Sequence, residues 1–214
     1  MEYGSLSAFF EAIAAEDYLV LRNYEDFEKP SFLTDHPDVD LLCRNARALA
    51  KRAGACPKGG REDGVHYAVT VAGQKVPVDL REVGDRYFDP KWEDAVLKSR
   101  KAHDSFFVME ETEYFYTLLY HALFHKKEIS PDYRDRLPAM AARLGIDFSW
   151  DNAKERLAAY MREKGYRFTY PQSRTLDPRF DGVPRDMIEK SASHSLRQMK
   201  KGIRRLAKKV LKRK

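Results

Sequence analysis

Two carboxylates at the start of an apolar run constrain this chain more than any other feature. They are Asp38 and Asp40 in residues 36–43, with the sequence HPDVDLLC. Successive side chains of a strand point to opposite faces, so both carboxylates are expected on one face, with Val39 and Leu41 in the core. Neighbouring carboxylates repel unless a cation lies between them, and hard oxygens favour a divalent ion. The pattern predicts either a metal site or a pair of turn carboxylates.

A third isolated carboxylate, Asp79, lies in residues 75–81, with the sequence KVPVDLR. Its apolar neighbours also favour a strand. Three acidic side chains on one face of a sheet would bind Mg²⁺ for phosphoryl-group chemistry. The metal interpretation of the acidic pair therefore gains support from this second strand.

The expected elements define an α+β protein with a small mixed β-sheet core, a helical C-terminal half and a basic amphipathic tail helix. Hydrophobic periodicity and turn signals give four parts of the chain: a core at 1–88, a helical domain at 89–165, a Pro-containing connector at 166–192 and the tail at 193–214. The core is expected to contain helices at 5–16 and 44–53 and strands at 18–22, 38–43, 66–71 and 75–83. Further helices are expected at 91–102, 110–126, 131–144 and 151–164.

The tail carries a charge opposite to that of the rest of the chain. Residues 197–214 contain ten Lys or Arg and no acid, which leaves residues 1–196 at about −4 of the net +6. Its apolar residues recur every three or four positions and would form one stripe on a basic helix. Three partners remain open: the protein itself or a second copy, an anionic membrane surface, and nucleic acid. The membrane is favoured over nucleic acid because the body is acidic.

The location expected for the chain is cytoplasmic, with peripheral attachment to the inner face of the membrane through the tail. The two cysteines, Cys43 and Cys56, have no metal-ligand spacing and form no disulfide framework. The N-terminus shows no secretory signal, and no apolar run is long enough to span a bilayer.

The order of elements and the three carboxylates resemble the minimal nucleotidyltransferases of the DNA polymerase β-like superfamily, over about residues 5–85. The resemblance implies that Asp38, Asp40 and Asp79 bind two Mg²⁺ ions and that a nucleoside triphosphate is the substrate. It also implies that Asp79 takes a proton from the acceptor. The family usually has a Gly-Ser or Gly-Gly phosphate-binding turn where this chain has Arg22 and Asn23. These two side chains would bind phosphates instead, or the departure means a divergent donor or an inactive enzyme.

A second likeness concerns the substrate class. Residues 19–25 and 116–126 look similar to nucleotidyltransferase-like proteins found with bacterial surface-polysaccharide machinery. The likeness implies a role in cell-surface glycan biosynthesis, with a glycan or lipid-linked acceptor.

The remaining candidate residues are basic or histidine side chains. His121 and His125 are four residues apart on one helix face. They are either core histidines or, with Lys126, phosphate contacts in the cleft, and a zinc site would need a further ligand that the sequence does not supply. Arg44 follows the acidic strand and is either a solvated residue or a phosphate contact.

The sequence therefore predicts a Mg²⁺-dependent nucleotidyltransferase that transfers a nucleotidyl group to a hydroxyl or phosphate acceptor. Two alternatives come from other classes of protein. One is a catalytically silent nucleotidyltransferase fold that serves as the binding subunit of a membrane-associated polysaccharide enzyme. The other is a nucleic-acid-binding adaptor that acts through the tail.

Overall fold

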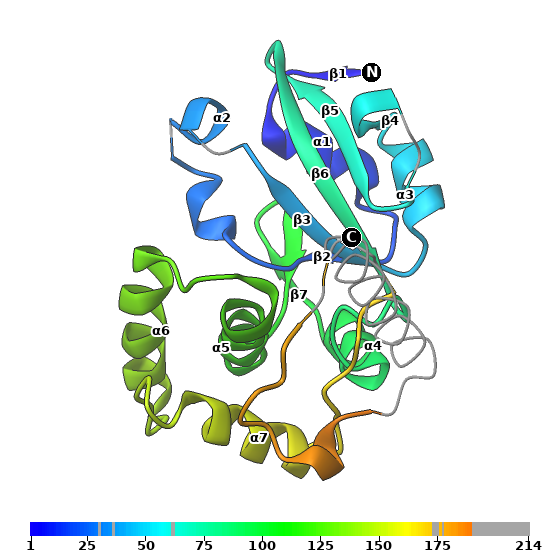
Figure 1. The fold of residues 1–214 in the computed structure, drawn as a ribbon. Helices are drawn as coiled ribbons and strands as arrows, with labels where there is room; N and C mark the ends of the chain where they lie inside the picture. Colours follow the sequence, from blue (N-terminus) through cyan, green and yellow to red (C-terminus); the bar gives the residue numbers. More distant parts are fainter. Residues whose placement is uncertain (30, 36, 61–62, 173–175, 177, 190–214) are drawn as a thin grey trace, which may run out of the picture.

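The chain is an α+β protein in which a mixed sheet lies against a group of helices (Figure 1). A computed structural model describes residues 1–29, 31–35, 37–60, 63–172, 176 and 178–189. Within these residues the main sheet has six strands in the order β1-β5-β6-β3-β2, and β4 pairs with β5. The predicted fold class is confirmed at this level.

The first half of the chain supplies the main sheet and the helices α1 and α3. Side chains of Ser5 and Asn45 cap these two helices, accepting hydrogen bonds from Ala8 N at 3.1 Å and Ala48 N at 2.9 Å. The elements are β1 (Glu2–Tyr3), α1 (Leu6–Ile13), β2 (Tyr18–Val20), the 3-10 helix η1 (Tyr24–Asp26), α2 (Phe32–Asp35), β3 (Val39–Cys43), α3 (Ala46–Arg52), β4 (Cys56–Pro57), the short turn η2 (Lys58–Gly60), β5 (His66–Val71) and β6 (Gln74–Glu82).

Strand β3 lies in the sheet between β6, to which it is parallel, and β2, to which it is antiparallel. The expected strands at 66–71 and 75–83 form a hairpin, in which the two residues Ala72 and Gly73, with φ angles of +47° and +76°, join β5 to β6. Two positive φ values give the turn a twist that matches the flanking strands. This turn fixes the register of β5 against β6.

The two faces of the sheet contribute to two different cores. On one face, Val39 and Leu41 of β3 lie in a core with residues of α1 and α3. On the other face, Leu42 lies in a second core with residues of the C-terminal helices. The predicted alternation along β3 is therefore confirmed, and Asp40 has the strand parity of Leu42.

The expected helix at 91–102 is wrong at its C-terminal end. Helix α4 covers Pro90–Lys98, and the chain then forms a hairpin of β7 (Lys101–His103) and β8 (Phe106–Val108). Asp104 turns the chain with φ +48°. Phe106 and Val108 are buried in the same core as α1, and the ring of Phe106 lies 4.9 Å from that of Phe10. Packing against the N-terminal core thus outweighs the helical pattern.

The remaining helices form one group on the other side of the sheet (Figure 1). At its centre lies α5 (Glu111–Tyr120), which continues as the π-helix η3 (His121–His125). Lys126 N closes the π-helical turn by donating to His121 O at 3.2 Å. Helix α6 (Pro131–Leu144) has the predicted bounds, and α7 (Ala153–Glu163) is slightly shorter than predicted.

The described part of the predicted connector runs back along the helices. Phe168 forms a parallel bridge with Ile188, shortly after the 3-10 helix η4 (Arg185–Met187), and Gln172 N donates to Asp85 O at 2.9 Å. The four predicted domain ranges stay predictions, and the predicted tail at 193–214 lies outside the described residues. Among the helices that the structure describes, none has the length and apolar character needed to cross a bilayer.

Candidate functional site

The structure brings the three predicted carboxylates to one region of the sheet. Asp40 on β3 and Asp79 on β6 are direct neighbours in the parallel register, and Asp38 precedes Asp40 by two residues. Burial raises the pKa of all three carboxyl groups. The charge of Asp79 raises the pKa of Asp38 further, and Asp40 does the same to Asp79. This mutual repulsion favours a cation among them.

Part of that positive charge comes from Arg22, which follows β2. Its guanidinium donates to Asp40 Oδ1 and, at 2.8 Å, to the hydroxyl of Tyr87. Asp40 is only 2% exposed. Burial opposes the charge of Arg22, but Asp40, with smaller contributions from Tyr87, Tyr133 and Asp38, raises the pKa of Arg22 overall, so this side chain is permanently charged.

Tyr87 in turn contacts two histidines of the helical half, His121 and His125. The Tyr87 hydroxyl lies 2.6 Å from His121 Nδ1, and the His125 ring centroid lies 4.2 Å from that of Tyr87. Burial, followed by the charge of Arg22, lowers the pKa of both histidines well below its ordinary value. Neutral His121 accepts a hydrogen bond from the Tyr87 hydroxyl, and the same hydroxyl accepts a hydrogen bond from Arg22. Asp40, Arg22, Tyr87 and His121 thus form one buried hydrogen-bonded chain, which we call the Asp40–His121 chain.

His66 is a site residue that the sequence analysis missed. It lies opposite Asp79 in the β5–β6 hairpin, with Nε2 at 3.8 Å from Asp79 Oδ2. Asp63 orients the imidazole by accepting from His66 Nδ1 at 2.5 Å and from its backbone N at 2.8 Å. Burial opposes ionisation of Asp63, but these hydrogen bonds and one from Val65 N lower its pKa to about 2. Asp63 thus holds the ring so that Nδ1 faces Asp63 and Nε2 faces Asp79.

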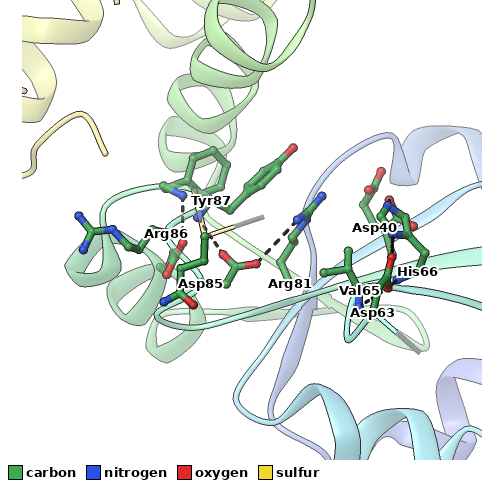
Figure 2. A network of polar contacts seen from close by, with 12 residues as sticks. Asp40, Asp63, Val65, His66, Arg81, Asp85, Arg86 and Tyr87 are labelled. Atoms are coloured by element: carbon green, nitrogen blue, oxygen red, sulfur yellow. Dashed lines mark hydrogen bonds and ion pairs between the residues drawn. The ribbon is translucent and has the colours of Figure 1, made fainter. Parts of the chain in front are cut away.

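Arg81 adds a second buried cation beside the carboxylates. Figure 2 shows it between the group of Asp40 and His66 and the turn that contains Asp85. Its guanidinium lies 3.8 Å from Asp85 Oδ2 and 4.5 Å from the centre of the Tyr87 ring. The charge of Arg81 lowers the pKa of Asp40 and of Asp79. It therefore partly compensates their repulsion.

A cavity of about 370 Å³ opens beside Asp38. This volume is in the range of small-molecule sites. Lys58 lies in its lining, and its charge, like that of the exposed Lys126, lowers the pKa of Asp38. The lining residues are Asn23, Asp26, Phe32, Pro37, Asp38, Lys58 and Pro77.

Most residues predicted to bind phosphate already have protein partners. Arg22 binds Asp40 and Tyr87, and His121 is buried against Tyr87. Asn23 has φ +59°, accepts from Arg136 at 2.7 Å and donates its backbone N–H to the Tyr114 hydroxyl at 3.1 Å. Of the six predicted phosphate-binding residues, the structure leaves Lys126 exposed near the carboxylates.

Arg44 is not brought to the carboxylates. It follows the last residue of β3, about 13 Å along the strand from Asp40. Its guanidinium pairs with Asp94 of α4 at 2.7 Å. The structure therefore gives Arg44 a partner on the helical side, and its contact with phosphate stays a prediction.

Ligand geometry for a metal ion is incomplete in the described part of the chain. There, no group of three or more His, Cys, Asp or Glu side chains has the arrangement of a ready-made metal site. Comparison of the chain with protein-family models, with curated proteins and with solved structures finds no match. The nucleotidyltransferase resemblance therefore rests on the residues and the topology alone.

Proposed function

We propose that the chain is a Mg²⁺-dependent nucleotidyltransferase that transfers a nucleotidyl group from a nucleoside triphosphate to a hydroxyl or phosphate acceptor. The observation that carries the proposal is the register of β3 and β6, in which Asp40 and Asp79 are direct neighbours. Asp38 is near enough to Asp79 for the charge of Asp79 to raise the pKa of Asp38. A bound divalent ion would neutralise developing charge on the phosphates and activate the acceptor oxygen.

The donor atoms suit such an ion in part. Asp38 is exposed and Asp79 is partly exposed, so both can offer hard carboxylate oxygens of the kind that Mg²⁺ prefers. Asp40 is hydrogen-bonded to Arg22 through Oδ1. The residues thus fit a divalent cation at Asp38 and Asp79.

The side chains around the carboxylates have roles in this proposal. Asp79, the direct neighbour of Asp40 in the register of β3 and β6, takes the proton of the acceptor hydroxyl. Lys126 and Lys58 bind phosphate oxygens from the solvent side. The cavity that contains Asp38 and Asn23 takes part of the nucleotide or of the acceptor.

Calorimetric titration of ATP, GTP, CTP and UTP, each with and without Mg²⁺, tests the proposal. We expect one nucleotide to bind in a Mg²⁺-dependent manner and to lose that binding in the Asp38→Asn/Asp40→Asn double variant. Asp147→Asn, which changes an exposed carboxylate that pairs with Arg156 away from the carboxylates of the sheet, is the control and should bind as the unaltered chain does. Equal binding by the double variant would sink the proposal.

A second candidate is a catalytically silent fold that serves as the binding subunit of a membrane-associated polysaccharide enzyme. The pairing of Asp40 with Arg22, in the place where the family has a phosphate-binding turn, favours it. Absence of nucleotide binding in the titration, with an intact fold, would favour this candidate over the enzyme.

The proposed setting of either activity is cell-surface glycan assembly at the inner face of the membrane. The acceptor would be a glycan or a lipid-linked intermediate, and residues 193–214 would bind the anionic lipid surface through their ten basic side chains. Nucleic acid is the less favoured partner of this segment, because residues 1–196 carry net negative charge.

A further inference from the structure

Arg22 is located where a cation is needed, at the most buried of the three carboxylates. Its side chain is 12% exposed and that of Asp40 is 3% exposed, so the pair is largely removed from water. Breaking such a pair by moving one partner leaves an uncompensated buried charge, which is costly. Displacement of Arg22 from Asp40 Oδ1 by a metal ion is therefore opposed by the protein.

The Asp40–His121 chain opposes that displacement further. Tyr87 is 2% exposed, and its hydroxyl contacts Arg22 at 2.8 Å and His121 at 2.6 Å. If Arg22 moved away, the buried Tyr87 hydroxyl would lose a charged donor. Arg22 is thus held at Asp40 from the side of the sheet and from the side of the helices.

Asp38 and Asp79 are in a different environment. Both are more exposed than Asp40, and no hydrogen bond to Arg22 occupies them in the part of the chain that the structure describes. Asp79 is the direct neighbour of Asp40 in the register of β3 and β6, and Asp38 precedes Asp40 by two residues, so the negative charges of Asp38 and Asp79 lie in one region of the sheet. A cation between these two carboxylates would remove that repulsion.

We infer that Arg22 takes the place of one of the two metal ions at Asp40, and that Asp38 and Asp79 bind a single divalent cation. The inference rests on the proposed function, because it concerns the metal ion which that function requires. It differs from the two ions that the resemblance implies. One permanent charge, supplied by the chain itself, replaces a second exchangeable ion.

Mn²⁺ alone, added to the full-length chain and counted by electron paramagnetic resonance of the free ion, tests the inference. We expect one bound ion in the unaltered chain and in Asp40→Asn. Asp38→Asn and Asp79→Asn remove a ligand, and each should weaken binding at least as much as loss of an outer-shell partner does, by about tenfold or more. Arg22→Met frees Asp40 and is expected to admit a second ion, whereas Arg22→Lys retains the charge and should still bind one.

The folded state of each variant is checked by circular dichroism. Because an unpaired charge at Asp40 or Arg22 can unfold the chain, the double variant Arg22→Met/Asp40→Leu, which removes both charges, is included. It should also bind one ion. Two ions on the unaltered chain, or loss of the ion from this folded double variant, would overturn the inference and leave the proposed function standing. No Mn²⁺ binding by the unaltered chain would overturn both.

Discussion

At the scale of single residues, the site depends on a tyrosine that belongs to neither the carboxylate group nor the predicted phosphate contacts. Tyr87 lies after β6, and its hydroxyl connects Arg22 with His121. Burial raises the pKa of Tyr87 to about 12, while the charge of Arg22 lowers it and that of Asp40 raises it. The hydroxyl therefore keeps its proton at neutral pH. It can therefore donate to His121 while it accepts from Arg22.

Tyr87→Phe tests this connection. Removal of the hydroxyl leaves a buried donor on Arg22 and a buried acceptor on His121 unpaired, and we expect a loss of about 1–3 kcal/mol in the free energy of unfolding. Tyr18→Phe is the matched control, since Tyr18 is buried and its hydroxyl has no hydrogen-bond partner among the described residues. Urea unfolding should show the control to be neutral or stabilising. Equal losses in both variants would contradict the role of Tyr87.

The sequence allows one further site residue, His66, to be predicted besides the three carboxylates. A two-residue turn at Ala72 and Gly73 pairs Val71 with Gln74, and five further steps along each strand bring His66 opposite Asp79. His66 could therefore have been predicted from the turn. Tyr87 could not, because its contact with Arg22 joins residues 65 apart and depends on how the helices lie against the sheet.

At the scale of elements, the turn from β6 to α4 is built around a buried acid. Glu93 of α4 is fully buried and accepts hydrogen bonds from Gly84 N at 2.7 Å and Phe88 N at 2.9 Å. Burial and, after it, the charge of Asp85 raise the pKa of Glu93 to about 8. Glu93 thus ties together the two ends of the turn that carries Tyr87.

The raised pKa predicts a pH dependence of stability. The folded chain binds the Glu93 proton more tightly than the unfolded chain, whose ordinary value is 4.5, so this contribution is full below that value and is lost as pH rises through about 8. The loss amounts to at most about 1.4 kcal/mol per pH unit. Asp85, whose pKa burial also raises, adds a loss of the same sign as pH rises.

Glu93→Gln removes one of these titrating groups. We expect the free energy of unfolding, measured with urea at several values between about pH 5 and about pH 8, to fall less steeply in this variant than in the unaltered chain. Glu128→Gln changes an exposed glutamate and should leave the slope unchanged. A slope in Glu93→Gln equal to that of the unaltered chain would show that Glu93 does not titrate in this window.

Local pattern predicted some elements and failed for others, for identifiable reasons. Helix α6 has its predicted bounds because Ser130 caps it and Gly145, with φ +66°, ends it. The hairpin of β7 and β8 was missed because Phe106 and Val108 owe their conformation to packing in the core of α1, far away in sequence. The π-helical turn at His121–His125 was predicted as ordinary helix, since the residues do not signal the change.

At the scale of the whole molecule, the site lies where the two cores meet. The carboxylates belong to the sheet, whereas Tyr87, which contacts Arg22, lies in the turn before α4, and its partner His121 begins η3. Segments near residues 22, 40, 79, 87 and 121 must therefore come together before the site exists. Sequence reasoning found the three carboxylates, because strand alternation is a local rule, and missed Tyr87, whose contact with Arg22 depends on how the helices pack on the sheet.

The basic segment at residues 197–214 has a charge opposite to that of residues 1–196, and this difference makes its proposed membrane binding testable. Residues 197–214 contain ten Lys or Arg and no acid, and each basic residue near an anionic lipid surface contributes about 1 kcal/mol. We therefore expect the full chain to sediment with vesicles that contain phosphatidylglycerol and not with phosphatidylcholine alone. A chain ending at residue 192 is the control and should stay in the supernatant.

Salt and a competing polyanion separate the membrane from the other partners. Binding to anionic vesicles should weaken as salt rises, because exposed charges are screened over about 8 Å at physiological ionic strength. Duplex DNA at the same phosphate concentration should displace little protein, since a polyanion repels the net negative charge of residues 1–196 and the apolar residues expected to form a stripe in 193–214 would be buried only by lipid. Displacement from the vesicles by DNA would instead assign the segment to nucleic acid, and the glycan setting proposed for the enzyme would lose its support from the tail.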